Sequence, residues 1–246
     1  MSEKLWFLKS CQLFEHLSPD ELRRIEMRSR ARTFPRKSPI YLPADEARSV
    51  YLLAKGRAKI CHLTPEGKQS ILAFIEPGEL FGELAILDSG AREEYAEAIE
   101  VSTVVMIPGD EIQRLMADLP ELSFGITKMI GMRRRRIERR LKNLLFLSNR
   151  ERLTHLLLEL AEQYGKSTSD GIQLGIKLSH QDLASVIGST RETVTVVLGE
   201  MQSEKLLKIG RRNILLLDPT RLAAIVQETT SRLPGESPRP SAASSR

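Results

Sequence analysis

The sequence has few of the side chains from which metal and cluster sites are made. Its 246 residues contain two cysteines, Cys11 and Cys61, and four histidines. Two thiols cannot supply the ligands of a four-cysteine zinc site or of an iron–sulfur cluster. We therefore expect no metal site and two free thiols, as is usual in a reducing compartment.

The sequence also lacks any long apolar run. A membrane-spanning helix needs roughly 18–20 consecutive apolar residues, and no segment approaches that length although 41% of the residues are hydrophobic. The stretch Met1–Ser10 has mixed charge and no apolar segment followed by small residues, so we expect no signal peptide. These absences predict a cytoplasmic protein without a membrane partner.

Positive charge is concentrated in the second half of the chain. Residues 1–118 carry 16 Lys/Arg and 19 Asp/Glu, a net charge of −3, whereas residues 119–246 carry 21 and 13, a net charge of +8. A basic half on an otherwise acidic chain predicts that this half contacts a polyanion. No Ser/His/Asp arrangement, phosphate-binding loop or metal-ligand cluster accompanies it, so the sequence does not favour an enzyme.

The first 118 residues are predicted to form a small β domain preceded by short helices. Ser18-Pro19-Asp20-Glu21 has the cap, the proline and the acids that begin a helix. From Arg32 to Ile107 short apolar runs alternate with Pro/Gly turns; the runs are Val50–Ala54, Ala58–Leu63, Ser70–Ile75 and Val101–Ile107. Many short strands at close spacing predict an antiparallel sandwich or roll.

Residues 119–147 are predicted to form one long helix. Seven positions recur at spacings of four and three: Leu122, Ile126, Ile130, Arg133, Ile137, Leu141 and Leu144. This is the pattern of a parallel two-stranded dimer seam, and the outer faces are crowded with arginine. The alternative is a surface helix of a single subunit.

Residues 148–232 are predicted to form a winged helix-turn-helix domain, and residues 233–246 a disordered tail rich in Ser, Pro and Arg. One helix begins at Asn149 and ends at Tyr164-Gly165, and a loop follows at Ser167–Gly171. The helix-turn-helix occupies Leu178–Gln202. Two further segments, Lys205–Gly210 and Arg211–Leu217, are predicted to be the strands of the wing.

Caps and a glycine mark the two helices of this element. Ser179-His180-Gln181-Asp182 is a variant capping box, Gly188 supplies the turn, and Ser189-Thr190-Arg191-Glu192 matches the box for the second helix. That helix is predicted to have a buried face formed by Val194, Val197, Leu198 and Met201. The opposite face presents Arg191, Glu192, Thr195 and Val196.

Polar side chains at the start of such a helix suit the major groove of DNA. Arg191 can donate to O6 and N7 of guanine, and Glu192 can accept from N4 of cytosine. Ser189 and Thr193 can hold phosphates. The predicted DNA-binding residues are Ser179, His180, Ser189, Thr190, Arg191, Glu192, Thr193, Thr195, Val196, Arg211 and Arg212. The alternative is that Glu192 is only a helix cap and Arg191 only a solvated charge.

Two motifs carry a resemblance to a known family: Pro77-Gly78-Glu79-Leu80-Phe81-Gly82-Glu83-Leu84 and Gly188-Ser189-Thr190-Arg191-Glu192-Thr193-Val194. Over about residues 10–220 the chain resembles the Crp/Fnr family of transcription regulators. The resemblance implies an α+β fold with an N-terminal antiparallel β-roll of the cyclic-nucleotide-binding type, a long dimerisation helix and a C-terminal winged helix-turn-helix. It further implies a homodimer that reads a pseudo-palindromic operator on double-stranded DNA, contacts RNA polymerase and senses an effector in the roll.

The resemblance does not fix the effector. Where the cyclic-AMP-binding members have Ser or Thr after a phosphate-binding arginine, this chain has Arg92-Glu93-Glu94, so cyclic AMP is disfavoured. In the branch that senses 2-oxoglutarate, the charged contacts correspond to Arg92, Arg133 and Glu138, which favours a small anionic effector. The candidate pocket residues are Phe81, Gly82, Glu83, Leu84, Arg92, Arg133, Ile137 and Glu138.

Other readings of the same residues stay open. Arg133 can instead pair with an acid of a partner chain or reach water, and the chain can be an effector-independent regulator or a ligand-binding module that binds DNA weakly. The iron–sulfur members of the family need four cysteines and are excluded. Haem is not expected, because neighbours on a strand point to opposite faces and Cys61-His62 therefore cannot bind one iron.

Overall fold

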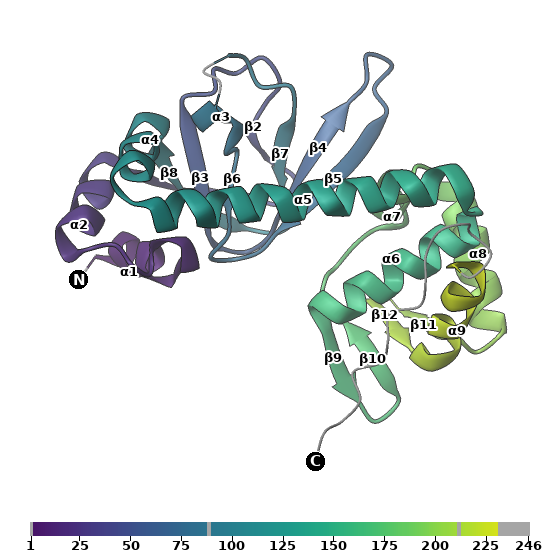
Figure 1. Cartoon of the computed structure of the whole chain (residues 1–246). Helices are drawn as coiled ribbons and strands as arrows, with labels where there is room; N and C mark the ends of the chain where they lie inside the picture. The colour runs from purple at the N-terminus through teal and green to yellow at the C-terminus, as the bar shows by residue number, and fades with distance from the viewer. Residues whose placement is uncertain (1, 88–89, 211–212, 231–246) are drawn as a thin grey trace. The chain divides into compact units, whose positions relative to one another are not determined.

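The computed structural model describes residues 2–87, 90–210 and 213–230 (Figure 1). The chain divides into two compact units, Met1–Arg139 and Arg140–Arg246, and the division falls inside one long helix. The predicted boundaries at 118 and 147 therefore stay predictions, and the predicted tail, 233–246, lies outside the described residues. None of the described helices is both long and apolar enough to cross a membrane.

The N-terminal unit begins with the expected short helices, α1 (Glu3–Ser10), η1 (Gln12–Phe14) and α2 (Pro19–Arg28). Helix α2 starts at the predicted place because Ser18 and Glu21 form a reciprocal capping box, which satisfies two amides that the first helical turn leaves free. The apolar side chains of these helices form a core with strands β3 (Ser49–Lys55) and β8 (Ser102–Pro108).

Antiparallel sheets follow, which confirms the predicted roll. One sheet has the strand order β1-β8-β3-β6 and another the order β2-β7-β4-β5. The strands are β1 (Arg30–Phe34), β2 (Pro39–Tyr41), β3 (Ser49–Lys55), β4 (Ala58–Leu63), β5 (Gln69–Ile75), β6 (Leu80–Phe81), β7 (Tyr95–Ala98) and β8 (Ser102–Pro108). Alternate side chains of both sheets, such as those of Leu53, Ala58 and Ile60, form a second core. Two short helices complete the unit, α3 (Leu84–Leu87) and α4 (Gly109–Asp118).

Both cysteines are free and buried, which confirms that part of the prediction. Burial disfavours the thiolate and raises the pKa of Cys11 and of Cys61 to about 11, although hydrogen bonds oppose the rise. Thiols of this kind are unreactive at neutral pH.

Helix α5 (Pro120–Phe146) is the predicted long helix, but its apolar stripe has two parts. The side chains of Leu122 and Ile126 are buried in the core of their own unit together with α1 and η1, so the prediction of a dimer seam is wrong for these two positions. By contrast Ile137, Leu141 and Leu144 remain 42%, 55% and 46% exposed. A repeat of apolar residues predicts that one face of a helix is buried, but it does not show which segment buries that face. Here α1 and η1 cover the first turns of α5.

The C-terminal unit has the predicted winged helix-turn-helix. Its elements are α6 (Asn149–Tyr164), β9 (Gly165–Thr168), β10 (Gly171–Leu174), α7 (His180–Ile187), α8 (Arg191–Ser203), β11 (Leu207–Gly210), β12 (Asn213–Leu216) and α9 (Pro219–Thr230). The predicted loop at Ser167–Gly171 is wrong at both ends, because β9 and β10 form a hairpin that joins the wing in a sheet of order β11-β12-β10-β9. Strand β10 pairs with β12, which follows only after α7, α8 and β11, and a local pattern cannot reveal such a pairing.

Candidate nucleic-acid interface and effector site

The turn between α7 and α8 is held from several sides. Helix α7 starts at the predicted capping box of Ser179 and Asp182 and ends at Gly188, whose φ of +64° is the left-handed conformation that favours glycine. Arg152 of α6 donates to the carbonyl oxygen of Ile187 at 2.9 Å. A Cβ at Gly188 would lie 2.8 Å from Cδ1 of Leu144. Glycine is thus favoured at position 188 for two reasons: its backbone conformation, and the lack of space for a side chain beside Leu144.

Gly188→Ala is expected to destabilise the protein by about 1–3 kcal/mol, because a side chain is strained at this φ and meets Leu144. The matched control is Gly199→Ala on α8, where an added Cβ meets nothing within 4 Å. That change should stabilise by about 0.5–1 kcal/mol, since alanine is the better helix former. Urea titrations followed by circular dichroism measure both; equal effects of the two changes would contradict the role given to the turn.

Helix α8 begins one residue later than its capping pattern predicts. The N-cap is Thr190, whose hydroxyl accepts from the amide of Thr193 at 3.1 Å. The predicted box of Ser189 with Glu192 is therefore wrong. The reason lies in the preceding turn, where the amide of Ser189 donates back to the carbonyl oxygen of Ala184 at 3.0 Å and so belongs to the end of α7. Because Glu192 is not needed as a cap, its exposed carboxylate stays available to a ligand.

The two faces of α8 are as predicted. Val194, Val197, Leu198 and Met201 are buried, whereas Arg191, Glu192, Thr195 and Val196 are exposed. Thr195 links the helices, because its hydroxyl donates to the carbonyl oxygen of Arg191 and lies 2.8 Å from Nδ1 of His180. A hydroxyl has one proton, so His180 must be the donor in the second bond and carries its proton on Nδ1.

A groove of about 510 Å³ joins the starts of α7 and α8 to the wing. Among the predicted residues it brings together Ser179, His180 and Arg191. It also contains Gln181 and Asn213, which the sequence analysis missed although amide side chains can bind adenine in pairs of hydrogen bonds. Arg211 and Arg212, the predicted tip of the wing, lie outside the described residues.

In the N-terminal unit the predicted effector residues Glu83, Arg92 and Arg133 are close together and largely buried. Arg133 of α5 donates to the Glu83 carboxylate at 2.6 Å and to the carbonyl oxygen of Leu80. The carboxylate that pairs with Arg133 thus belongs to the same chain. The sequence analysis considered instead an acid of a second chain, or water.

Arg92 lies against aromatic rings. Its guanidinium carbon is 4.2 Å from the ring centre of Tyr41 and 5.1 Å from that of Tyr51. One of its terminal nitrogens donates to the carbonyl oxygen of Ser49 at 2.6 Å, while Nε is buried without a hydrogen-bond partner. A buried donor without an acceptor is costly, and a ligand oxygen bound to this atom would remove that cost.

Glu94 completes the group and was missed as a member of it. Its carboxylate accepts from the Tyr41 hydroxyl at 2.9 Å. Burial raises the pKa of Glu94, and the nearby Glu83 adds to the rise, while the Tyr41 bond, Arg92 and Arg133 oppose it. Glu93, its neighbour in the sequence, is exposed.

The other predicted pocket residues divide into two groups. Phe81 is buried with its ring 5.3 Å from that of Tyr51, and Gly82 has a φ of +67° and leaves room for Arg92. Leu84 and Ile137 are 50% and 42% exposed, and Glu138 forms an exposed ion pair with Arg134. The structure therefore does not bring these three into the buried group. The described residues show no cluster of His, Cys, Asp and Glu that could hold a metal ion.

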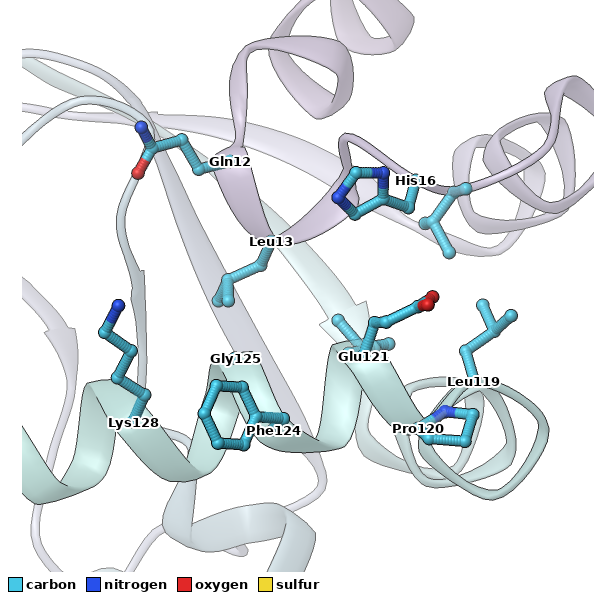
Figure 2. Close-up of a pocket in the computed structure, with 11 residues that line it drawn as sticks. Gln12, Leu13, His16, Leu119, Pro120, Glu121, Phe124, Gly125 and Lys128 are labelled. Carbon is cyan, nitrogen blue, oxygen red and sulfur yellow. The ribbon is translucent and has the colours of Figure 1, made fainter.

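A second groove, of about 530 Å³, was not predicted (Figure 2). It lies between η1 and the start of α5, where the side chain of Leu13 packs against Gly125. Phe124, at its edge, is 71% exposed and extends the apolar surface of α5.

Comparison with known proteins agrees with both units. Residues 31–118 match the cyclic nucleotide-binding domain model, and residues 151–225 match the Crp-like helix-turn-helix domain model. The global nitrogen regulator of Nostoc sp. is 31% identical over 193 residues, which are 78% of this chain and 86% of the relative. The chain belongs to the Crp/Fnr family.

Further Crp/Fnr relatives cover most of the chain. The CRP-like cAMP-activated global transcriptional regulator of Mycobacterium tuberculosis is 26% identical over 86% of this chain and 94% of its own length. The crystal structure of a CRP-family transcriptional regulator of Thermus thermophilus is 29% identical, with a TM-score of 0.68, and covers 80% of this chain and 96% of the other. As a Crp/Fnr protein the chain is a DNA-binding transcription regulator, and its predicted fold class is confirmed.

Proposed function

We propose that two copies of this chain bind a pseudo-palindromic operator, with one helix α8 in the major groove of each half-site. The observation that carries this proposal is the start of α8, where Arg191, Glu192 and Thr195 are exposed on one face while the other face is buried. Half-sites about 34–36 Å apart fit a dimer of this kind. A regulator of bacterial chromosomal DNA acts in the cytoplasm, and we extend the proposal to a contact with RNA polymerase.

The side chains of this surface have separate roles in the proposal. Arg191 reads guanine and Glu192 reads cytosine, because their donors and acceptors match those base edges. Val196 is 60% exposed and can contact a thymine methyl group. The hydroxyls of Ser189, Thr190 and Thr193, with Arg211 and Arg212, hold phosphates and set the register.

The dimer in this proposal is formed by the second half of α5. Ile137, Leu141 and Leu144 expose apolar surface to solvent in the single chain, and a parallel partner helix would bury them. In the proposal the partner helix packs against this second half of α5, because the first turns of α5 are already covered by the chain's own N-terminal helices.

The effector in the proposal is a small anion of the 2-oxoglutarate class, held by Arg92 and Arg133. The unpartnered Nε of Arg92 supports it. Cyclic AMP stays disfavoured in the proposal, because Glu93 and Glu94 follow Arg92 where the resemblance implies Ser or Thr in the cyclic-AMP-binding members. An effector-independent regulator is the second candidate, favoured by the Arg133–Glu83 ion pair, which already joins α5 to the roll at 2.6 Å.

Selection of bound duplexes from a random pool tests the DNA-binding proposal. We expect enrichment of an inverted repeat, and an association constant whose logarithm falls with the logarithm of salt concentration by about 0.9 per phosphate contact. A pool that shows no enriched sequence would favour the alternative, a ligand-binding module whose DNA binding is weak.

A further inference from the structure

The buried group in the roll contains charges of both signs in equal number. We define the Arg–Glu cluster as Glu83, Arg92, Glu94 and Arg133; its formal charges cancel. Arg133 and Glu83 are 2.6 Å apart. Arg92 and Glu94 are connected through Tyr41, whose ring lies under the guanidinium and whose hydroxyl donates to the carboxylate.

An anion that enters this cluster therefore adds uncompensated negative charge to a buried site. Charge of one sign is costly where water is largely excluded, and the cost is relieved when a carboxylate is protonated. Glu83 is bound by the guanidinium of Arg133. Glu94 can accept that proton, since its hydrogen-bond donor is a neutral hydroxyl that can stay bound to the protonated acid's carbonyl oxygen.

We propose that the Arg–Glu cluster binds an anion together with one proton, which passes from solvent to the carboxylate of Glu94. This inference rests on the anionic effector proposed above and adds its proton coupling. The group that gains the proton becomes a neutral carboxylic acid, and no covalent bond other than the new O–H is formed. The proton offsets one of the two negative charges that a 2-oxoglutarate dianion brings into the cluster.

The groups that act on Glu94 determine the direction of the effect. Burial is the largest cause of its raised pKa; Tyr41 from β2 and the arginines Arg92 and Arg133 lower that pKa, and Glu83 raises it. A bound anion adds a second like charge and offsets the arginines, so the pKa of Glu94 rises further. Between the pKa values of the free and the bound site, affinity for the anion must increase as the pH falls.

Titration calorimetry of the full-length protein tests the proposal with two probes, 2-oxoglutarate and cyclic AMP. As the pH is lowered from about pH 8 towards the pKa of Glu94 in the free site, we expect the association constant of a bound probe to rise by at most about tenfold per pH unit. Repetition in buffers of different ionisation enthalpy should show uptake of at most one proton. Binding without a pH dependence, or no binding of either probe at any pH, would overturn the inference, while the duplex selection above is unaffected by that result.

Variants at adjacent positions identify the group. Glu94→Gln keeps an acceptor for Tyr41 but cannot titrate, so its affinity should be independent of pH and its proton uptake should vanish. Glu93→Gln makes the same change at an exposed site and should behave as the wild type. Tyr41→Phe removes a hydrogen bond that lowers the pKa of Glu94, and should move the pH profile to higher pH. A pH dependence that persists in Glu94→Gln would assign the proton elsewhere.

Discussion

Arg191→Ala is expected to reduce discrimination at one base pair of the operator half-site by about 1–3 kcal/mol. Arg191 is the first residue of α8 and is exposed, in the groove that also contains His180 and Asn213. A guanidinium there can donate two parallel hydrogen bonds to guanine, and no other base pair offers the same two acceptors in the major groove. Affinities for duplexes substituted at each position of the selected operator, measured by fluorescence anisotropy, give the discrimination directly.

The control for this variant is Arg221→Ala, which removes the same charge from the exposed surface of α9 in the same unit. Loss of a charge alone weakens binding to all sequences alike and reduces the salt dependence. Arg191→Ala must in addition weaken the preference for one base pair of the operator half-site. A uniform loss of affinity across all duplexes, equal to that of the control, would show that Arg191 is a phosphate contact and not a base reader.

Much of the DNA-reading element could be predicted because its signals are local. The helix start at Asn149, the capping box at Ser179 and the buried face of α8 each depend on residues within one or two helical turns. The prediction of the α8 cap was wrong because two hydroxyl residues follow each other. Only the left-handed turn at Gly188, which draws the Ser189 amide back to α7, decides that Thr190 is the cap.

The effector group could be predicted only in part, because its members come from distant strands. The family motif pointed to Glu83, and the resemblance to the 2-oxoglutarate-sensing branch pointed to Arg92 and Arg133. Tyr41 and Tyr51, which stack with each other at 5.2 Å and hold Arg92, come from earlier strands and carry no motif. Their roles follow from the packing of β2 against β3 and β6, and such packing leaves no trace in local spacing.

The long helix shows a different limit of sequence periodicity. Leu122 and Leu141 belong to one apolar stripe, yet the first is 4% exposed and the second 55% exposed. The stripe was predicted to face a partner along its whole length. In the structure the chain's own α1 and η1 cover its start, so the part left for a second copy begins beyond Ile130.

Leu141→Glu is expected to convert the dimer into a monomer and to weaken operator binding by about 10²-fold or more. The exposed leucine lies in the part of α5 that remains uncovered, between Ile137 and Leu144. A carboxylate buried there would face its copy across the seam, and two such charges cannot be desolvated together without a large cost. A monomer can still place one α8 in one half-site, but it loses the effective concentration that the second half-site gains from the first. Sedimentation velocity gives the mass, and anisotropy with whole and half operators gives the affinities.

The matched control is Met132→Glu, which makes the same kind of change on the same helix. Met132 is 47% exposed and precedes Leu141 by nine residues, so at about 100° per residue it lies on the opposite side of α5. It should leave both the dimer and the operator affinity unchanged. If Met132→Glu dissociates the dimer and Leu141→Glu does not, the partner helix packs on the other face of α5. If neither does, the two copies associate elsewhere, and the spacing of their reading helices no longer follows from this helix.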